Sequence, residues 1–176
     1  MNLIFREISF GSEAYPQTVK LREEVLRKPL GLEFSREQLD SEAGDYHLCV
    51  MAEQGPLACL VLTPHAEGCL RMRQVAVSPD HQKNGIGRLL VAFSEGFAIE
   101  KYCREMVLHA REEAIPFYKK LGYKVYDEPF KELEIPHRKM KKVLPAPRIF
   151  RNSYKKGMGG NYEKSNFEDW ETRPGK

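Results

Sequence analysis

Long apolar segments are scarce in this 176-residue sequence. No hydrophobic run approaches the ~20 residues that a transmembrane helix requires. The N-terminal segment 1–7 carries Arg6 and Glu7 where a signal peptide would have its long apolar region. We therefore expect a cytoplasmic protein that does not bind a membrane.

Cysteine is also rare, and its spacing is not that of a metal site. The four cysteines form no C-x-x-C pair and lie in segments of strand-like or helical character: Cys49, Cys59, Cys69 and Cys103. This pattern favours reduced, buried thiols that act as small hydrophobic side chains. We expect no metal site, and a catalytic cysteine is the less favoured alternative.

Charge of one sign is not in large excess. The formal net charge is +3 at pH 7, from 28 basic and 25 acidic residues. A value this small gives no reason to expect nucleic-acid binding, although it would assist the arrival of a polyanionic cofactor. The length and the 41% hydrophobic content suit one globular domain with an extension.

What the sequence does contain is a strand, a loop and a helix start in direct succession. Gln74–Val77 is short, mostly apolar and β-branched, which is typical of a central strand. Gly85 and Gly87 stand directly before a helical pattern, where backbone N–H groups are unpaired at the positive end of the helix. With Lys83 and Arg88 alongside, this arrangement predicts an anion-binding loop.

Two common nucleotide-binding motifs do not match this stretch. A dinucleotide fold requires G-x-G-x-x-G after its first strand, whereas here Leu90 occupies the third glycine position and the motif lies mid-chain. The P-loop pattern G-x-x-x-x-G-K-[ST] is absent. By itself the stretch also fits an ordinary strand–helix unit with a glycine-capped turn.

Two segments together carry a resemblance to a known family. Gln82-x-x-Gly85-x-Gly87 resembles the Q/R-x-x-G-x-G/A pyrophosphate loop of the GNAT family, the N-acetyltransferases that use acetyl-coenzyme A. Ala114–Tyr123 resembles the A-x-x-F-Y-x-x-L-G-F segment of the same family, and the two segments occur in the family's order. A third segment, Glu134–Met140, is similar to an I-P-H-x-x-M ending found in some bacterial branches, including ElaA-like proteins.

The resemblance implies an α/β (α+β) domain with the GNAT fold over residues 1–144. Its central sheet would be mixed but mostly antiparallel, with six to seven strands, a V-shaped splay and about four flanking helices. Residues 145–176 mix charges, glycines and scattered aromatics without periodicity, so we expect a C-terminal extension that is flexible or docked. Docking on a second subunit would make the protein a homodimer.

Periodicity and turn residues predict the individual elements. A helix after an N-cap at Ser12 would carry Arg22, Glu23, Glu24 and Arg27 on its water-facing side. Pro29 and Gly31 would end this helix. Ser35 and Gln38 have the spacing of a capping box, which opens a second short helix. The remaining expected elements are an edge strand 3–10, hairpin strands 46–51 and 57–62, strand 70–77, helix 85–102, strand 106–109, helix 112–121, and strands 123–126 and 133–143.

A cofactor site follows if the strands 70–77 and 106–109 are parallel neighbours that separate beyond the anion loop. Backbone groups between them would then have no partner, and a pantetheine arm with two amides can pair with them like an added strand. By the resemblance, acetyl-CoA is the co-substrate, and the expected cofactor-binding residues are Val75, Ala76, Val77, Gln82, Lys83, Asn84, Gly85, Ile86, Gly87, Arg88, Ala114, Phe117 and Tyr118.

Acetyl transfer requires a neutral amine, stabilisation of the developing oxyanion and a proton for the leaving thiolate. Tyr118 matches the family tyrosine that donates to the coenzyme A sulfur, and a phenol of pKa ~10 is protonated at neutral pH. The alternative is that Tyr118 only packs its helix against the sheet. A main-chain N–H of Val75 or of a neighbour would stabilise the oxyanion.

The general base is left open by the sequence. Many family members carry a glutamate on the central strand, where this chain has Arg71, Met72 and Arg73. Those two arginines either face solvent or attract an acidic acceptor. The substitute bases, acting directly or through water, are Glu33, His109, Glu134 and His137. We take Tyr118, Glu134 and His137 as the candidate catalytic residues.

The acceptor pocket of the family borders the early helical region. Leu32, Glu33 and Phe34 are therefore candidates for substrate contact, or else Leu32 and Phe34 are core residues. The preferred function is an N-acetyltransferase that moves an acetyl group from acetyl-CoA to a primary amine of a small molecule or protein. The alternatives are transfer of a longer acyl group and a non-catalytic coenzyme A-binding or interaction module.

Overall fold

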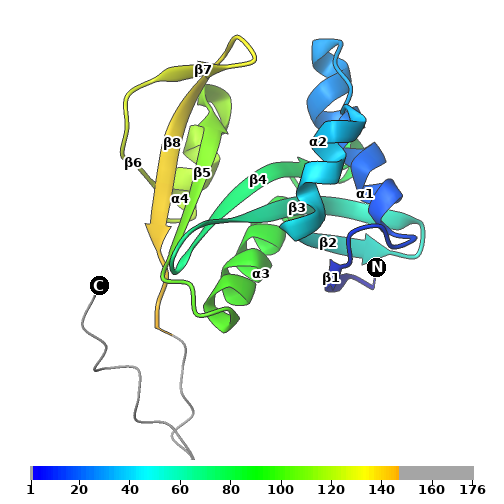
Figure 1. Ribbon diagram of the computed structural model, residues 1–176, viewed down its shortest axis with the longest axis horizontal. Coiled ribbons are helices and arrows are strands. Elements are labelled where there is room, and N and C mark those ends of the chain that lie inside the picture. The colour runs from blue at the N-terminus through cyan, green and yellow to red at the C-terminus, as the bar shows by residue number, and fades with distance from the viewer. Residues whose placement is uncertain (1, 147–176) are drawn as a thin grey trace, which may run out of the picture.

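The computed structural model describes residues 2–146, which form one open sheet with helices on both faces (Figure 1). The eight strands run in the order β1-β2-β3-β4-β5-β8-β6, and β7 pairs with β8. All pairs are antiparallel except β4 with β5. The strands are β1 (Ile4–Ile8), β2 (Tyr46–Ala52), β3 (Gly55–Ala66), β4 (Cys69–Val77), β5 (Glu105–Arg111), β6 (Lys124–Val125), β7 (Phe130–Glu132) and β8 (Ile135–Val143).

The helical segments complete the fold. The α-helices are α1 (Tyr15–Arg22), α2 (Arg36–Asp40), α3 (Ile86–Glu100) and α4 (Ile115–Lys120). Shorter turns flank them: the π-helical η1 (Glu23–Arg27) and the 3-10 turns η2 (Lys28–Leu30), η3 (Ser41–Gly44), η4 (Pro79–His81) and η5 (Glu112–Ala114). Within residues 2–146, no helix is both long enough and apolar enough to cross a membrane.

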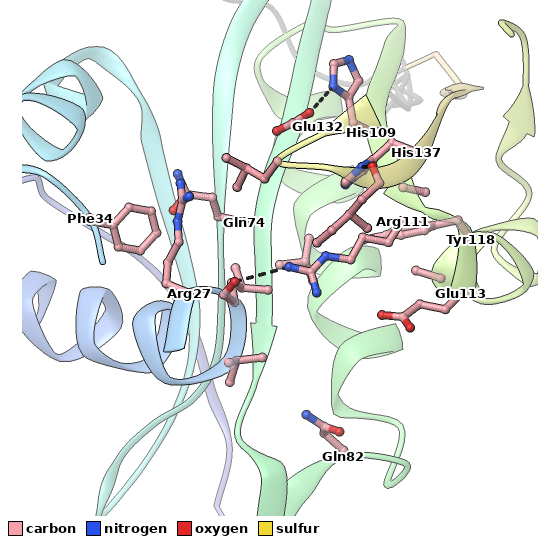
Figure 2. A pocket seen from close by; sticks show the side chains of 17 residues that line it. Arg27, Phe34, Gln74, Gln82, His109, Arg111, Glu113, Tyr118, Glu132 and His137 are labelled. Atoms are coloured by element: carbon pink, nitrogen blue, oxygen red, sulfur yellow. Dashed lines mark hydrogen bonds and ion pairs between the residues drawn. The ribbon is translucent and has the colours of Figure 1, made fainter. Parts of the chain in front are cut away.

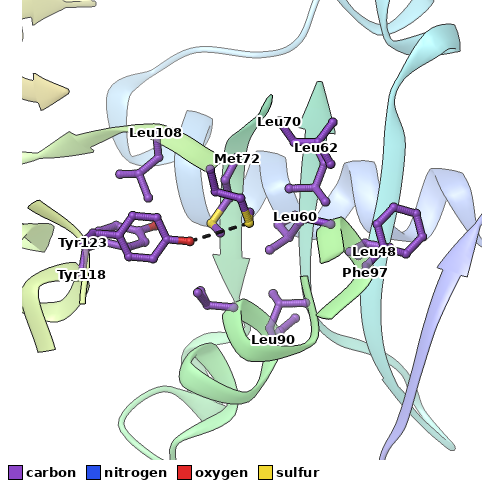
Figure 3. Packing of buried hydrophobic residues seen from close by; sticks show 14 of the residues in the cluster. Leu48, Leu60, Leu62, Leu70, Met72, Leu90, Phe97, Leu108, Tyr118 and Tyr123 are labelled. Carbon is purple, nitrogen blue, oxygen red and sulfur yellow. Dashed lines mark hydrogen bonds between the residues drawn. The ribbon is translucent and has the colours of Figure 1, made fainter. Parts of the chain in front are cut away.

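Side chains alternate between two cores because successive strand residues face opposite sides of the sheet. α3 and α4 cover the larger core, in which Leu48, Leu60 and Met72 are nearly inaccessible to solvent (Figure 3). α1 covers the smaller core, which contains Cys49 and Cys59. All four cysteines are buried and unpaired, as expected.

The central strands separate at one end, as the resemblance implies. β4 pairs with β5 only from Cys69 to Met72, and beyond this point β5 continues against β8 alone. β4 has a bulge just beyond this point, because Gln74 and Val75 together lie opposite Leu60 of β3. Gln74 adopts a φ of 52°, a conformation that side-chain-bearing residues rarely take. The separation leaves residues 73–77, more than half of β4, without a strand neighbour on the β5 side.

Three local predictions are wrong. The first helix does not begin at Ser12: Ala14 is its N-cap, since Pro16 occupies the first turn, where a missing N–H is tolerated. Arg22 does not face water and is 1% exposed, because a carboxylate partner compensates its charge. Leu133 and Glu134 are not strand residues: both have positive φ and form the turn between β7 and β8. That hairpin adds one strand to the six or seven expected.

Cap signals that act within a few residues are confirmed. Ser35 Oγ accepts from Gln38 N–H at 3.1 Å, while the Gln38 side chain accepts from Ser35 N–H at 3.0 Å. Gly31 follows η2 in the left-handed conformation, at the helix end that the sequence predicts. The expected extension 147–176 lies outside the described residues.

Candidate functional site

A cavity of about 410 Å³ occupies the gap between the separating strands (Figure 2). One wall comes from η1 and the segment that contains Phe34, and the floor includes Gln74 and Val75 of β4. The opposite wall comes from the end of β5, from α4 and from the β7–β8 hairpin. Segments that are far apart in the sequence therefore line the same cavity.

The loop before α3 lies at one end of this cavity. Gln82 lines the cavity, and its side-chain amide donates to the Val77 carbonyl oxygen at 3.1 Å. Gly85 is the N-cap of α3 with a φ of 81°, a conformation that favours glycine. The first intrahelical bond runs from Leu89 N–H to the Gly85 carbonyl oxygen. The N–H groups that precede it in α3 are thus available to an anion.

Gly87 lies against two neighbouring elements at ordinary contact distances. A Cβ atom at this position would lie 3.4 Å from Cγ2 of Val77 and 3.7 Å from Cζ of Phe117. Lys83, Asn84 and Arg88 are exposed around the same loop. The loop therefore combines accessible main-chain donors with exposed positive charges, which is suitable for a phosphate group.

Some predicted cofactor residues can contribute only their main chain. Ala76 is fully buried in the core under α1, and Ile86 is 6% exposed in the core under α3. Val77 is half-buried beside Gly87, and Val75 lines the cavity. Ala114 also lines the cavity, whereas Phe117 does not and has its ring beside Gly87.

Tyr118 extends from α4 into the cavity wall. It is 8% exposed, and its ring makes edge contacts with Phe117 at 5.0 Å and Tyr123 at 5.8 Å between ring centres. Burial raises the pKa of Tyr118 above its ordinary value, because the phenolate would lose its hydration. The hydroxyl is therefore protonated at neutral pH, as a proton donor must be.

His137 is the best placed of the predicted catalytic groups other than Tyr118. It lines the cavity from β8, is 8% exposed, and its Nδ1 lies 2.8 Å from the Ile135 carbonyl oxygen. Since a carbonyl oxygen only accepts, Nδ1 carries a proton in this contact, and in the neutral ring Nε2 is the nitrogen with a lone pair. The ring is thereby held in the tautomer that can accept a proton through Nε2.

A second histidine belongs to a charged cluster. His109 Nδ1 lies 2.8 Å from Arg71 Nη2 and 3.0 Å from Glu132 Oε2. Burial and the nearby positive charges of Arg71 and Lys139 lower the pKa of His109, and Glu132 opposes this shift. The neutral ring can accept from Arg71, and the protonated ring can donate to Glu132.

Other predicted residues are not brought together with these groups. Glu134 is at the hairpin tip, where its side chain is 88% exposed and lies 3.2 Å from Lys131. Glu33 is exposed and Leu32 half-buried, and neither lines the cavity, whereas Phe34 does. The sequence did not indicate the cavity-lining side chains of Arg27, Arg111 and Glu132, which depend on the convergence of distant segments.

The sequence matches a known domain family over most of its length. Residues 15–144 match the model described as the acetyltransferase (GNAT) domain. The chain is also 27% identical over 136 residues to the uncharacterized N-acetyltransferase YjcF of Bacillus subtilis, which is 77% of this chain and 96% of YjcF.

Solved structures have the same fold. Escherichia coli ElaA superposes with a TM-score of 0.69 at 15% identity, covering 80% of this chain and 99% of ElaA. A GNAT family acetyltransferase from Elizabethkingia anophelis with acetyl-CoA bound superposes with a TM-score of 0.64 at 17% identity, covering 81% of this chain and 99% of that chain. At these identities the likeness establishes the fold, and the family match extends from α1 to the end of β8. The chain belongs to the GNAT family of acetyltransferases.

Proposed function

We propose that this protein transfers an acetyl group from acetyl-CoA to a primary amine of a small molecule or protein. One observation carries the proposal: a single cavity connects the loop before α3 with Tyr118 and Phe34, in the gap where β4 loses its β5 partner. The acetyl-CoA bound in the structural neighbour from Elizabethkingia anophelis supports the same choice of co-substrate.

The residues around the cavity fit the parts of acetyl-CoA. The main-chain N–H groups at the start of α3, with Lys83 and Arg88, would bind the diphosphate. The unpaired edge of β4 at Val75–Val77 would hydrogen-bond with the amides of the pantetheine arm, as in strand addition. When bound, acetyl-CoA supplies a thioester whose carbonyl carbon accepts the amine. Gly87 keeps the loop free of a side chain at this point.

Groups of this chain would then transfer two protons and stabilise the developing negative charge of the oxyanion. Tyr118, kept protonated by burial, would donate to the departing thiolate sulfur. His137, with Nε2 free to accept, would take the proton of the amine directly or through water. A main-chain N–H of the β4 bulge, at Val75 or a neighbour, would stabilise the oxyanion.

The proposal is tested with the purified full-length chain. Thermal denaturation is measured with acetyl-CoA, succinyl-CoA and longer acyl-CoA thioesters, and free-thiol release is then followed against a panel of primary amines. We expect stabilisation by acetyl-CoA and amine-dependent release of the thiol. Stabilisation by acetyl-CoA without thiol release against any amine would favour a coenzyme A-binding module. Stronger stabilisation or faster thiol release with a longer acyl-CoA would identify that longer acyl group as the one transferred.

A further inference from the structure

The cavity contains a guanidinium group that has no carboxylate partner. Arg27 is the last residue of η1, and its Cζ lies 4.5 Å from the centre of the Phe34 ring. Both side chains line the cavity. Among the ion pairs formed within residues 2–146, none includes Arg27. The positive charge is held at the cavity wall without being neutralised there.

The two arginines that the sequence suggested for an acidic acceptor are already engaged. Arg73 Nη1 donates to Thr63 Oγ1 at 3.1 Å and lies 3.7 Å from Asp45 Oδ2. Arg71 Nη2 lies 2.8 Å from His109 Nδ1. Their guanidinium groups serve contacts between neighbouring strands and turns. Arg111 also lines the cavity without an ion pair to any described residue, but its Nη2 donates to the Leu26 carbonyl oxygen at 3.3 Å. This leaves Arg27 as the candidate for binding an anion.

The opposite wall of the cavity carries groups of the complementary kind. Glu132 of β7 lies beside His109, and His137 follows on β8 (Figure 2). In the same view, Arg27 and Phe34 approach from the side of η1. An acceptor between these walls would meet a cation on one side, and a carboxylate with two imidazoles on the other.

We propose that the acceptor is a small amine that also carries a carboxylate, as an amino acid does, and that Arg27 binds this carboxylate. The proposal rests on the acetyl-transfer function proposed above and adds the substrate class. The amino group would face Glu132 and His137, with the thioester approaching from the Tyr118 side. A cavity of about 410 Å³ is of the size that small ligands occupy.

The setting of Arg27 favours a carboxylate over other partners. A guanidinium presents parallel N–H donors that match the two oxygens of a carboxylate, and a ring against one face holds it in a fixed plane. Partial burial and the positive charges of Arg111, Arg22 and Arg73 lower the pKa of Arg27, whereas Glu132 raises it. A cation in such surroundings gains more from a bound anion than one in free solvent.

Matched sets of amines test the substrate class. Each amino acid is compared with its carboxamide and with the amine that lacks the carboxyl group, by acetyl-CoA-dependent thiol release. We expect kcat/KM for the amino acids to exceed that for both counterparts by at least about tenfold. Equal rates for amino acids and their carboxamides would overturn the substrate class while leaving acetyl transfer in place.

Arg27→Met tests the residue, and Arg36→Met is its matched control. Arg36 is 95% exposed on α2 and does not line the cavity. We expect Arg27→Met to reduce kcat/KM for amino acids about tenfold or more, to leave carboxamides unaffected, and to keep stabilisation by acetyl-CoA. Arg36→Met should behave as the unmodified chain. Equal losses for amino acids and carboxamides would assign Arg27 a structural role and contradict the proposal.

A binding measurement decides the case in which no amine reacts. The chain is saturated with coenzyme A, and its further thermal stabilisation by each amino acid and each carboxamide is compared. Stabilisation by amino acids alone, lost in Arg27→Met, would support the carboxylate site even if acetyl transfer fails. Stabilisation by neither set would overturn it. The response to acetyl-CoA by itself reports separately on the proposed function.

Discussion

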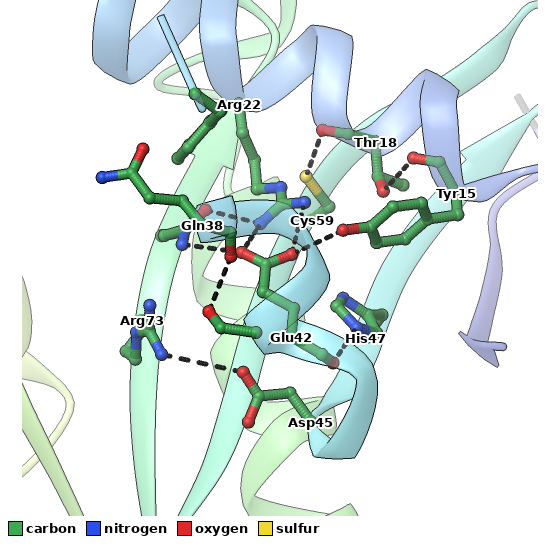
Figure 4. Close-up of polar contacts among 12 residues, drawn as sticks. Tyr15, Thr18, Arg22, Gln38, Glu42, Asp45, His47, Cys59 and Arg73 are labelled. Carbon is green, nitrogen blue, oxygen red and sulfur yellow. Dashed lines mark hydrogen bonds and ion pairs between the residues drawn. The ribbon is translucent and has the colours of Figure 1, made fainter. Parts of the chain in front are cut away.

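Arg22 donates to both carboxylate oxygens of Glu42, through Nη1 to Oε1 at 2.8 Å and through Nη2 to Oε2 at 3.0 Å (Figure 4). Each side chain is 1% exposed. Tyr15 O–H donates to Glu42 Oε2 at 2.8 Å, and the Gln74 side-chain amide donates to Glu42 Oε1 at 2.9 Å. Arg22 Nη1 also donates to Gln74 Oε1. The network connects α1 and η3 to the bulge of β4, where the backbone of Gln74 is in a rare conformation.

Glu42→Gln is expected to destabilise the fold strongly, because it leaves the Arg22 cation buried without its counter-charge. Removing one partner of a buried ion pair costs about 3–5 kcal/mol, and the retained amide should keep the loss near the lower value. Urea denaturation of the two chains measures the difference in free energy of unfolding. A loss below about 1 kcal/mol would show that water reaches this pair.

The same pair predicts a pH dependence. Burial raises the pKa of Glu42, but the hydrogen bonds and charge of Arg22, with help from Tyr15 and Gln74, outweigh this and lower it overall. A lowered folded-state pKa contributes stability that is present above the unfolded value, about 4.3, and is lost as the pH falls through the folded value. The difference in free energy of unfolding between the unmodified chain and Glu42→Gln should therefore be constant near neutral pH and decrease only in acid.

Local signals explain which parts of the fold were predictable. The capping box at Ser35 and the turn after η2 depend on contacts within a few residues, and both are confirmed. The parallel pairing of β4 and β5 follows from the helical crossover that connects them, because strand–helix–strand units normally place their two strands in parallel. Burial of Arg22 depends on Glu42, twenty residues later in the chain, so a helical pattern that treats arginine as solvent-facing assigns it wrongly.

The same distinction applies to the candidate site. Gln82 and Tyr118 belong to contiguous motifs, and the structure brings both to one cavity. Arg27 and Glu132 reach that cavity only because η1 and the β7–β8 hairpin fold over it from different parts of the chain. The hairpin turn at Leu133 and Glu134 lacks the Asn-Gly signal that is typical of such turns. The sequence pattern therefore predicted a strand from Leu133 onward and did not predict β7.

Tyr118→Phe tests the proton donor. The ring and its contacts with Phe117 and Tyr123 are retained, so acetyl-CoA should stabilise the variant as it does the unmodified chain. We expect kcat to fall about 100-fold or more, since the departing thiolate loses its acid. Tyr123→Phe is the matched control, because it removes a buried hydroxyl whose contact is Met106 Sδ at 3.8 Å. Unchanged kcat in Tyr118→Phe would leave that residue a packing role alone.

His137→Asn tests the candidate base against Glu134→Gln. His137 is buried in the cavity wall with Nε2 free to accept, whereas the Glu134 side chain is 88% exposed at the hairpin tip. We expect the first variant to lose about 100-fold in kcat at neutral pH and the second to retain it. Steady-state kinetics with one amine at saturating acetyl-CoA make the comparison. The reverse order of losses would return the base to Glu134 and require the hairpin to close over the cavity.

Gly87→Asp tests the anion loop without removing its helix. A carboxylate in the first turn of α3 is favourable for the helix, because it lies at the positive end of the dipole, but it repels a diphosphate at the same N–H groups. The new Cβ would meet Val77 and Phe117 at 3.4 Å and 3.7 Å, which the neighbours can tolerate. We expect the Kd for acetyl-CoA, measured by titration calorimetry, to rise at least about tenfold at little cost in stability. Gly96→Asp places the same charge further along the helix. Apart from the adjacent residues and the backbone of α3 itself, no described atom lies within 4 Å of the new Cβ, and this variant should bind acetyl-CoA normally. Equal Kd values for the two variants would mean that the diphosphate binds elsewhere, because a negative charge at residue 87 would repel a diphosphate bound at the start of α3.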